Sequence, residues 1–70
     1  MKNNILKKFA KRLVQIRKDN EMTQEELSRK TKISRSTIAM LETSKRDITL
    51  TKIEKIAKAL NVEIKELLNF

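Results

Sequence analysis

Apolar residues recur every three or four positions along most of the chain, which is the spacing of one face of an α-helix. The first such run is Leu6, Phe9, Leu13 and Ile16, and it predicts a helix from about residue 4 to residue 19. Glycine and proline are both absent, so tight hairpin turns and stiff interdomain linkers have no signal in the sequence. We therefore expect a single all-α domain of five helices without internal repeats.

Capping residues mark the starts of the second and third helices. Thr23, with Glu26 three positions later, forms a capping-box pattern, and the helix that follows carries Leu27 and should end near Thr31. Ser34 is the expected cap of the third helix, which buries two apolar residues and turns a polar face outwards. The buried pair is Ile38 and Leu41, and the outward residues are Arg35, Ser36, Thr37 and Ala39.

The last third of the chain predicts two more helices. Thr49 or Thr51 should start the fourth, which has the apolar stripe Ile53, Ile56, Ala57 and Leu60. A short fifth helix should follow, with Ile64, Leu67 and Leu68 on its inner side.

Residues 24–43 have the anatomy of a helix-turn-helix, with two short helices about three residues apart. Ile33 in the connecting turn is apolar and can fill the corner between the helices. The second helix opens with a serine cap and polar residues, which suits a helix whose N-terminal end enters the major groove of DNA. There Arg35 can donate two hydrogen bonds to guanine, Thr37 offers a methyl group to thymine, and Ser36 can bond a base or a phosphate.

Charge favours a polyanionic partner. The chain has 17 Lys and Arg against nine Asp and Glu, a formal charge of +8. Residues 1–18, which include Lys2, hold basic residues and no acid, and residues 29–46 are basic with Glu42 as the one acid. Nucleic acid or an anionic membrane surface would fit this imbalance, and a merely solvated lysine-rich surface is the alternative. With two Phe and no Trp or Tyr, recognition by base stacking is disfavoured.

The composition also argues against several function classes. Without cysteine or histidine, the chain has no disulfide, thiolate zinc site, cysteine nucleophile or imidazole base, so the hydroxyls of Ser34, Ser36 and Thr37 lack an activating partner. We expect no enzyme activity, no metal, no cofactor and no small-molecule effector. No apolar run approaches the length of a membrane span, and five capped segments differ from one long membrane-active helix. We expect no membrane partner and a cytoplasmic, nucleoid-associated protein.

Three longer runs resemble a known family: TQEELS at 23–28, ISRSTI at 33–38 and IEKIAKALNV at 53–62. Together with Leu41-Glu42 and Glu66-Leu67-Leu68, they are similar to the phage-repressor (XRE, Cro-type) family of helix-turn-helix regulators over roughly residues 9–68. The resemblance implies a compact five-helix, lambda-repressor-like DNA-binding domain over residues 1–70. It also implies a transcriptional regulator that binds double-stranded DNA at a palindromic operator as a dimer.

A narrower resemblance concerns the segment SKRDITL at 44–50, which is similar to the controller proteins of restriction-modification systems. Such proteins bind paired operators and time the expression of a restriction endonuclease. The alternative function is an antitoxin that neutralises a partner protein and represses its own operon, because both classes retain the DNA-reading helix.

The resemblance further implies residue roles. Gln24 matches a family glutamine that holds a phosphate and buttresses the recognition helix, and the loop carrying Lys45 and Arg46 contacts the backbone and sometimes a base. Arg17 matches a frequent arginine of the first helix, with Glu42 as its expected ion-pair partner and DNA contact as the alternative. The expected base-reading set is Arg35, Ser36, Thr37 and Arg46, and the expected phosphate-contact set is Thr23, Gln24, Ser34, Lys45, Thr49 and Lys52.

The chain departs from the family at positions that usually hold glycine, namely Glu21, Lys32, Ser44 and Asn61, and at Ile48, where proline is usual. Those glycines often adopt positive φ, a conformation that costs another residue roughly 1 kcal/mol or more. We therefore expect left-handed backbone at non-glycine residues.

Apolar residues at the C-terminus exceed what a core of this size needs. In the family the fourth and fifth helices commonly form a two-fold interface, so we expect a homodimer through about residues 50–70. The expected interface set is Leu50, Ile64, Leu67, Leu68 and Phe70. The alternative is a tail that folds back on the first helix.

Overall fold

The computed structural model describes residues 4–70, so Lys2 lies outside the described residues. Five α-helices follow one another in this part of the chain, which contains no β-strand. They are α1 (Asn4–Asp19), α2 (Gln24–Thr31), α3 (Arg35–Glu42), α4 (Leu50–Leu60) and α5 (Ile64–Leu67). The prediction of an all-α, five-helix chain is confirmed. None of the helices in residues 4–70 is both long enough and apolar enough to cross a membrane.

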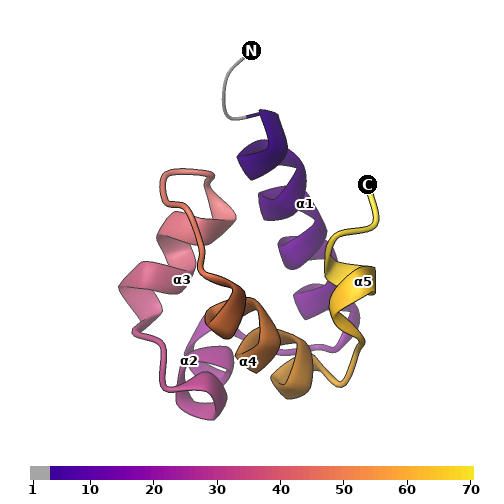
Figure 1. Ribbon diagram of the computed structural model, residues 1–70. Coiled ribbons are helices and arrows are strands. Elements are labelled where there is room, and N and C mark those ends of the chain that lie inside the picture. The colour runs from indigo at the N-terminus through magenta and orange to yellow at the C-terminus, as the bar shows by residue number, and fades with distance from the viewer. Residues whose placement is uncertain (1–3) are drawn as a thin grey trace.

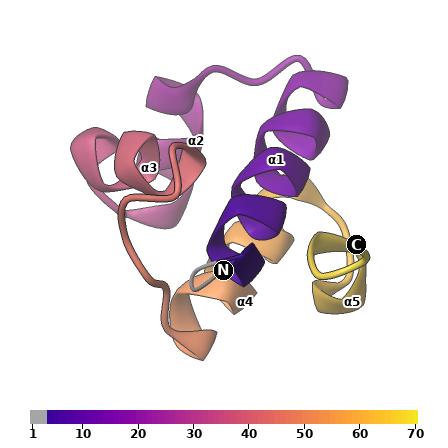
Figure 2. The ribbon, with the colours of Figure 1, turned by 90° about the horizontal axis from the view of Figure 1, so that it is seen from above.

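The helices pack around one centre. α1 lies against α3 and α5, α2 lies against α3 and α4, and α4 contacts α5. Figures 1 and 2 place α3 and α5 on opposite sides of the molecule, with α1 and α4 between them. The outer face of α3 is therefore well separated from the C-terminal helix.

A single hydrophobic core joins all five helices. It contains the apolar positions that the helical spacing singled out except Leu6, Ile64 and Leu68, and seven of its side chains are less than 2% exposed. The core members are Phe9, Leu13, Ile16, Leu27, Ile33, Ile38, Leu41, Ile53, Ile56, Ala57, Leu60 and Leu67. Because Ile38 and Leu41 of α3 are buried in this core, α3 is held rigidly against the other helices.

Side-chain caps explain where the helices begin. The Thr23 hydroxyl accepts from the Glu26 N–H at 3.0 Å, and the Glu26 carboxylate accepts from the Thr23 N–H at 2.9 Å, which completes the capping box. Ser34 caps α3 by accepting from the Thr37 N–H at 3.1 Å. Thr49, and not Thr51, caps α4, since its hydroxyl accepts from the Lys52 N–H at 3.2 Å. Each such cap stabilises its helix by about 1 kcal/mol.

Four turns have left-handed backbone at residues with side chains. Glu21, Lys32, Ser44 and Asn61 have φ values of 55°, 64°, 58° and 60°. These are the four positions at which the sequence led us to expect this conformation, so that prediction is confirmed. Lys32 closes α2, and its N–H donates to the Ser28 carbonyl at 2.8 Å, so its geometry is set by the end of the helix.

Lys32→Gly is expected to raise the free energy of unfolding by up to about 1 kcal/mol, because glycine adopts positive φ without a steric penalty. For a domain of this size the gain corresponds to an increase in Tm of roughly 4–8 °C. Lys30→Gly, the same chemical change two residues earlier inside α2, is the matched control and should lower stability by about 1 kcal/mol. Thermal denaturation of both variants would test this, and a lower Tm for Lys32→Gly would contradict it.

The fifth helix corrects two predictions. Only Leu67 points inwards, with 0% of its surface exposed, whereas Ile64 and Leu68 are 40% and 41% exposed. A helix of four residues makes little more than one turn, so it brings a single side chain to the core. Leu67 accordingly has no exposed surface with which to contact a second subunit, which corrects its place in the expected interface.

Candidate nucleic-acid interface

The turn between α2 and α3 is held by hydroxyl groups as well as by the buried Ile33. The Ser28 hydroxyl donates to the Ile33 carbonyl at 2.6 Å, and Thr31, itself buried, donates to the Leu27 carbonyl at 2.8 Å. The Ile33 N–H donates to the Thr31 hydroxyl at 3.2 Å. The sequence did not predict either hydroxyl role, because such contacts leave no periodic signal. These bonds fix the angle at which α3 leaves the turn.

The N-terminal end of α3 presents a polar, positively charged surface. Arg35 and Ser36 are exposed, Thr37 is half-buried, and the first turn of the helix carries no acid. Arg35 has no salt-bridge partner among the described residues, so its guanidinium is available to a ligand. The helix dipole adds partial positive charge at this end. The arrangement suits an electronegative partner such as the acceptor edge of guanine.

Hydroxyl groups at the start of α3 are partly committed to one another. Ser34 donates to the Thr37 hydroxyl at 2.8 Å, and the Ser36 hydroxyl lies 3.3 Å from that of Ser34. The Thr37 hydroxyl therefore keeps its own proton for an outside acceptor. Ser34, predicted to contact phosphate, serves in this structure as the helix cap, with its proton directed to Thr37.

A buried ion pair connects the recognition helix to α1. Arg17 Nε lies 2.6 Å from Glu42 Oε2, and Arg17 Nη2 donates to Glu42 Oε1 at 3.0 Å. The third contact of this guanidinium is the Met22 carbonyl, at 2.8 Å. Both side chains are shielded, with 11% and 4% of their surfaces exposed. The expected pairing of Arg17 with Glu42 is confirmed.

Gln24 joins this pair to the start of α2. Its Nε2 donates to Glu42 Oε1 at 2.9 Å, which supports the predicted buttressing of the recognition helix. A carboxamide nitrogen carries two hydrogens, so one remains for a phosphate oxygen. Because Arg17 pairs with Glu42 and Gln24 donates to it, the charge of the single acid in the basic stretch 29–46 is neutralised and its oxygens are hydrogen-bonded.

The loop from α3 to α4 brings more cationic groups to the surface. Lys45 and Arg46 are exposed, and the loop is anchored by Ile48, which packs against the core. Ser44 turns the chain in its left-handed conformation, and the Lys45 N–H donates to the Met40 carbonyl at 2.9 Å. The loop is thus tied to both the end of α3 and the core, while its two basic side chains remain available.

The phosphate candidates at helix starts are of two kinds. The capping hydroxyls of Thr23 and Thr49 accept from backbone N–H groups, which leaves each hydroxyl proton free to donate. Lys52, half-buried in the first turn of α4, adds a positive charge beside Thr49.

No group of three or more acidic residues in the described part of the chain is arranged to hold a metal ion.

Exposed apolar side chains lie on α4 and at the C-terminus. Leu50 is 78% exposed and Phe70 is 49% exposed, in addition to Ile64 and Leu68. The C-terminal segment also contacts α1: Arg12 Nε donates to the Glu66 carbonyl at 2.7 Å. Folding back onto α1 therefore accounts for Leu67 but leaves the other apolar residues uncovered. Ile5 on α1, 63% exposed, was not singled out from the sequence.

Comparison with known proteins places the chain in a family. Residues 13–67 match the helix-turn-helix family HTH_3, so the protein belongs to this class of helix-turn-helix proteins. Within it, the chain is 41% identical over 71 residues to the control protein C.BamHI of Bacillus amyloliquefaciens, covering 100% of this chain and 88% of that protein.

Solved structures agree with this assignment. The restriction-modification controller protein C.AhdI from Aeromonas hydrophila has a TM-score of 0.87 and 35% identity, over 89% of this chain and 94% of its own. The controller protein C.Esp1396I, solved as a tetramer with its natural 35-base-pair operator, has a TM-score of 0.81 and 33% identity, over 93% and 96% of the two chains. The predicted resemblance to controller proteins is confirmed.

Proposed function

We propose that this protein is a sequence-specific transcriptional regulator of the restriction-modification controller type, which binds double-stranded operator DNA as a homodimer. The observation that carries the proposal is the exposed, acid-free N-terminal end of α3, a helix whose last residue, Glu42, is bound by Arg17 of α1 and Gln24 of α2. A related controller protein, C.Esp1396I, was solved with its operator as a tetramer, which supports the choice of ligand.

Recognition would combine two kinds of contact. Residues at the start of α3 and in the following loop read base edges in the major groove, namely Arg35, Ser36, Thr37 and Arg46. The phosphate contacts come from helix starts and the same loop, namely Thr23, Gln24, Lys45, Thr49 and Lys52. Ser34 would join them by turning its hydroxyl proton from Thr37 to a phosphate oxygen. Phosphate contacts supply affinity that falls with salt, and base contacts supply preference for one sequence.

Dimerisation would present two recognition helices to the same face of the DNA, one in each of two successive major grooves. The exposed apolar residues Leu50, Ile64, Leu68 and Phe70 lie within residues 50–70 and would be covered by a second copy. A two-fold dimer of this class sets its recognition helices about 34 Å apart, one turn of DNA, and so requires a palindromic operator.

We infer that residues 1–70 act as one DNA-binding domain, with the helix-turn-helix at about 24–43, and that regulation proceeds by binding without catalysis, cofactor or small effector. The hydroxyl group of Ser34 donates a hydrogen bond to the hydroxyl group of Thr37, and not to a catalytic general base that could activate it as a nucleophile. Work on DNA would place the protein in the cytoplasm beside the nucleoid. The relatives give no support to the antitoxin alternative.

Affinity selection from a random duplex library, followed by sequencing of the bound fraction, tests the proposed function. We expect a two-fold symmetric motif whose half-sites recur about one helical turn apart, roughly 10 base pairs. Failure to enrich any motif at moderate salt would argue against sequence-specific regulation by this protein alone.

A further inference from the structure

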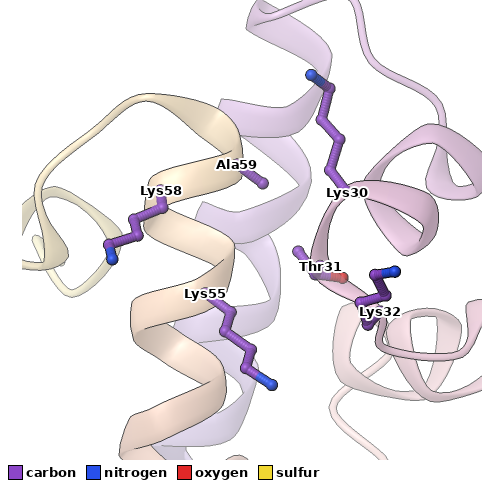
Figure 3. A pocket seen from close by; sticks show the side chains of 6 residues that line it. All are labelled: Lys30, Thr31, Lys32, Lys55, Lys58 and Ala59. Atoms are coloured by element: carbon purple, nitrogen blue, oxygen red, sulfur yellow. The ribbon is translucent and has the colours of Figure 1, made fainter.

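A hollow of about 500 Å³ lies between the C-terminal end of α2 and the second half of α4 (Figure 3). Four lysines and no carboxylate line it, so it concentrates positive charge, and none of the four belongs to the proposed base-reading set. The lining residues are Lys30, Thr31, Lys32, Lys55, Lys58 and Ala59, and we call this surface the lysine groove.

The charged groups of the groove come from both helices. Figure 3 shows Lys30 and Lys32 on the α2 side, and Lys55 extending from α4 to the side of Lys32, whereas Lys58 extends away from it. The hydroxyl of Thr31 is already used on the Leu27 carbonyl, at 2.8 Å. No aromatic or large aliphatic side chain lines the groove, so its apolar surface is limited to lysine stems, the Thr31 methyl group and Ala59, and it has no set of directional hydrogen-bonding groups.

This chemistry selects the kind of partner. A protein partner normally needs a buried apolar or aromatic anchor at the centre of its interface, and the lysine groove has none. Lysine ammonium groups are mobile point charges, which contact phosphates at variable geometry and do not distinguish base sequence. The groove has lysines on both of its walls and no groups that would recognise a specific partner. The polyanion that fits such a surface is the phosphate backbone of a nucleic acid.

The position of the groove points to the same DNA that α3 reads. Lys32 stands two residues before Ser34, the cap of α3, so the groove begins at the N-terminal end of the recognition helix. We propose, resting on the function proposed above, that the lysine groove binds the backbone of operator DNA just outside the half-site contacted by α3. DNA bent towards the protein would bring these flanking phosphates within reach, and the contacts would offset the cost of bending.

A double variant, Lys30→Gln with Lys55→Gln, removes one charge from each wall of the groove. Both side chains are exposed, neither forms a salt bridge within the described residues, and glutamine is a good helix former, so the fold should be retained. Lys8→Gln with Lys11→Gln is the matched control. These two lysines are exposed on α1 and line a hollow with Phe70. Figures 1 and 2 show the C-terminal end of the chain on the side of the molecule opposite α3.

Binding is measured by fluorescence anisotropy on two duplexes of the selected operator. One ends at the outermost specified base pair, and the other extends roughly ten base pairs, about one helical turn, beyond it on each side. The wild-type protein should bind the long duplex about tenfold more tightly, and the groove variant should forfeit most of this advantage while binding the short duplex normally. On the long duplex, the slope of log K against log salt should fall by about one for each phosphate that the variant no longer neutralises.

The control variant should keep the wild-type advantage on the long duplex. The inference is overturned if the groove variant keeps that advantage too, or if its affinity falls equally on both lengths. A scrambled long duplex separates this result from a failure of the proposed function. If the wild-type protein prefers the operator over the scrambled duplex, only the groove is in question; without that preference both proposals fall.

Discussion

Replacing Glu42 with alanine is expected to lower the free energy of unfolding by roughly 3–5 kcal/mol, the usual cost of leaving a buried charge without its partner. The substitution removes both carboxylate oxygens that accept hydrogen bonds from the Arg17 guanidinium. The Met22 carbonyl is then the remaining acceptor of that guanidinium. It also removes the acceptor of Gln24. A domain of this length is stable by only roughly 4–10 kcal/mol, so the loss should be evident in urea denaturation.

Two further variants show whether burial is the cause. Glu25 pairs with Arg29 at 3.7 Å on the surface, where both side chains are about two-thirds exposed, so Glu25→Ala should cost no more than about 0.5 kcal/mol. Arg17→Met combined with Glu42→Leu leaves no charge in the site and should recover much of the lost stability. A loss for Glu42→Ala no larger than that for Glu25→Ala would refute the buried-pair argument.

Arg35→Ala is expected to weaken binding to the selected operator by roughly 1–3 kcal/mol and to change binding to random DNA little. The side chain is exposed and has no salt-bridge partner among the described residues, so the free energy of unfolding should be nearly unchanged. Its expected role is a bidentate contact with guanine, which a scrambled duplex does not offer at that position. Anisotropy titrations of the operator and a scrambled duplex at one salt concentration give both affinities.

Lys45→Ala is the comparison for a phosphate contact, because Lys45 is an exposed cation on the loop after α3. It should weaken binding to both duplexes to a similar extent and lower the salt dependence. If Arg35→Ala behaves in the same way as Lys45→Ala, Arg35 contacts backbone and the base-reading assignment must move to other residues.

Helix positions could be predicted because they depend on short-range patterns. Periodic burial and capping act over three or four residues, so α1 and the caps at Thr23 and Ser34 lie where the sequence placed them. Thr49 and Thr51 could not be separated, since either hydroxyl could cap the next helix. α5 is too short for periodicity to show which side faces inwards, which explains the errors at Ile64 and Leu68.

Contacts between residues far apart in the sequence could be predicted only where a family resemblance supplied long-range information. Arg17 and Glu42 lie 25 residues apart, and their pairing came from the resemblance and not from any local pattern. The hydroxyl contact of Ser28 with Ile33 depends on the path of the turn. The lysine groove joins residues 30–32 to residues 55–58, which meet only because α2 packs against α4.

Lys32 illustrates a conflict between folding and binding at a single backbone position. Its left-handed conformation penalises the folded state, yet its side chain supplies one wall of the lysine groove. Glycine there would relieve the backbone and at the same time delete a cation, so the variant that melts at the higher temperature should hold flanking DNA less tightly. Selection for thermal stability and selection for operator occupancy would therefore drive this position towards different residues.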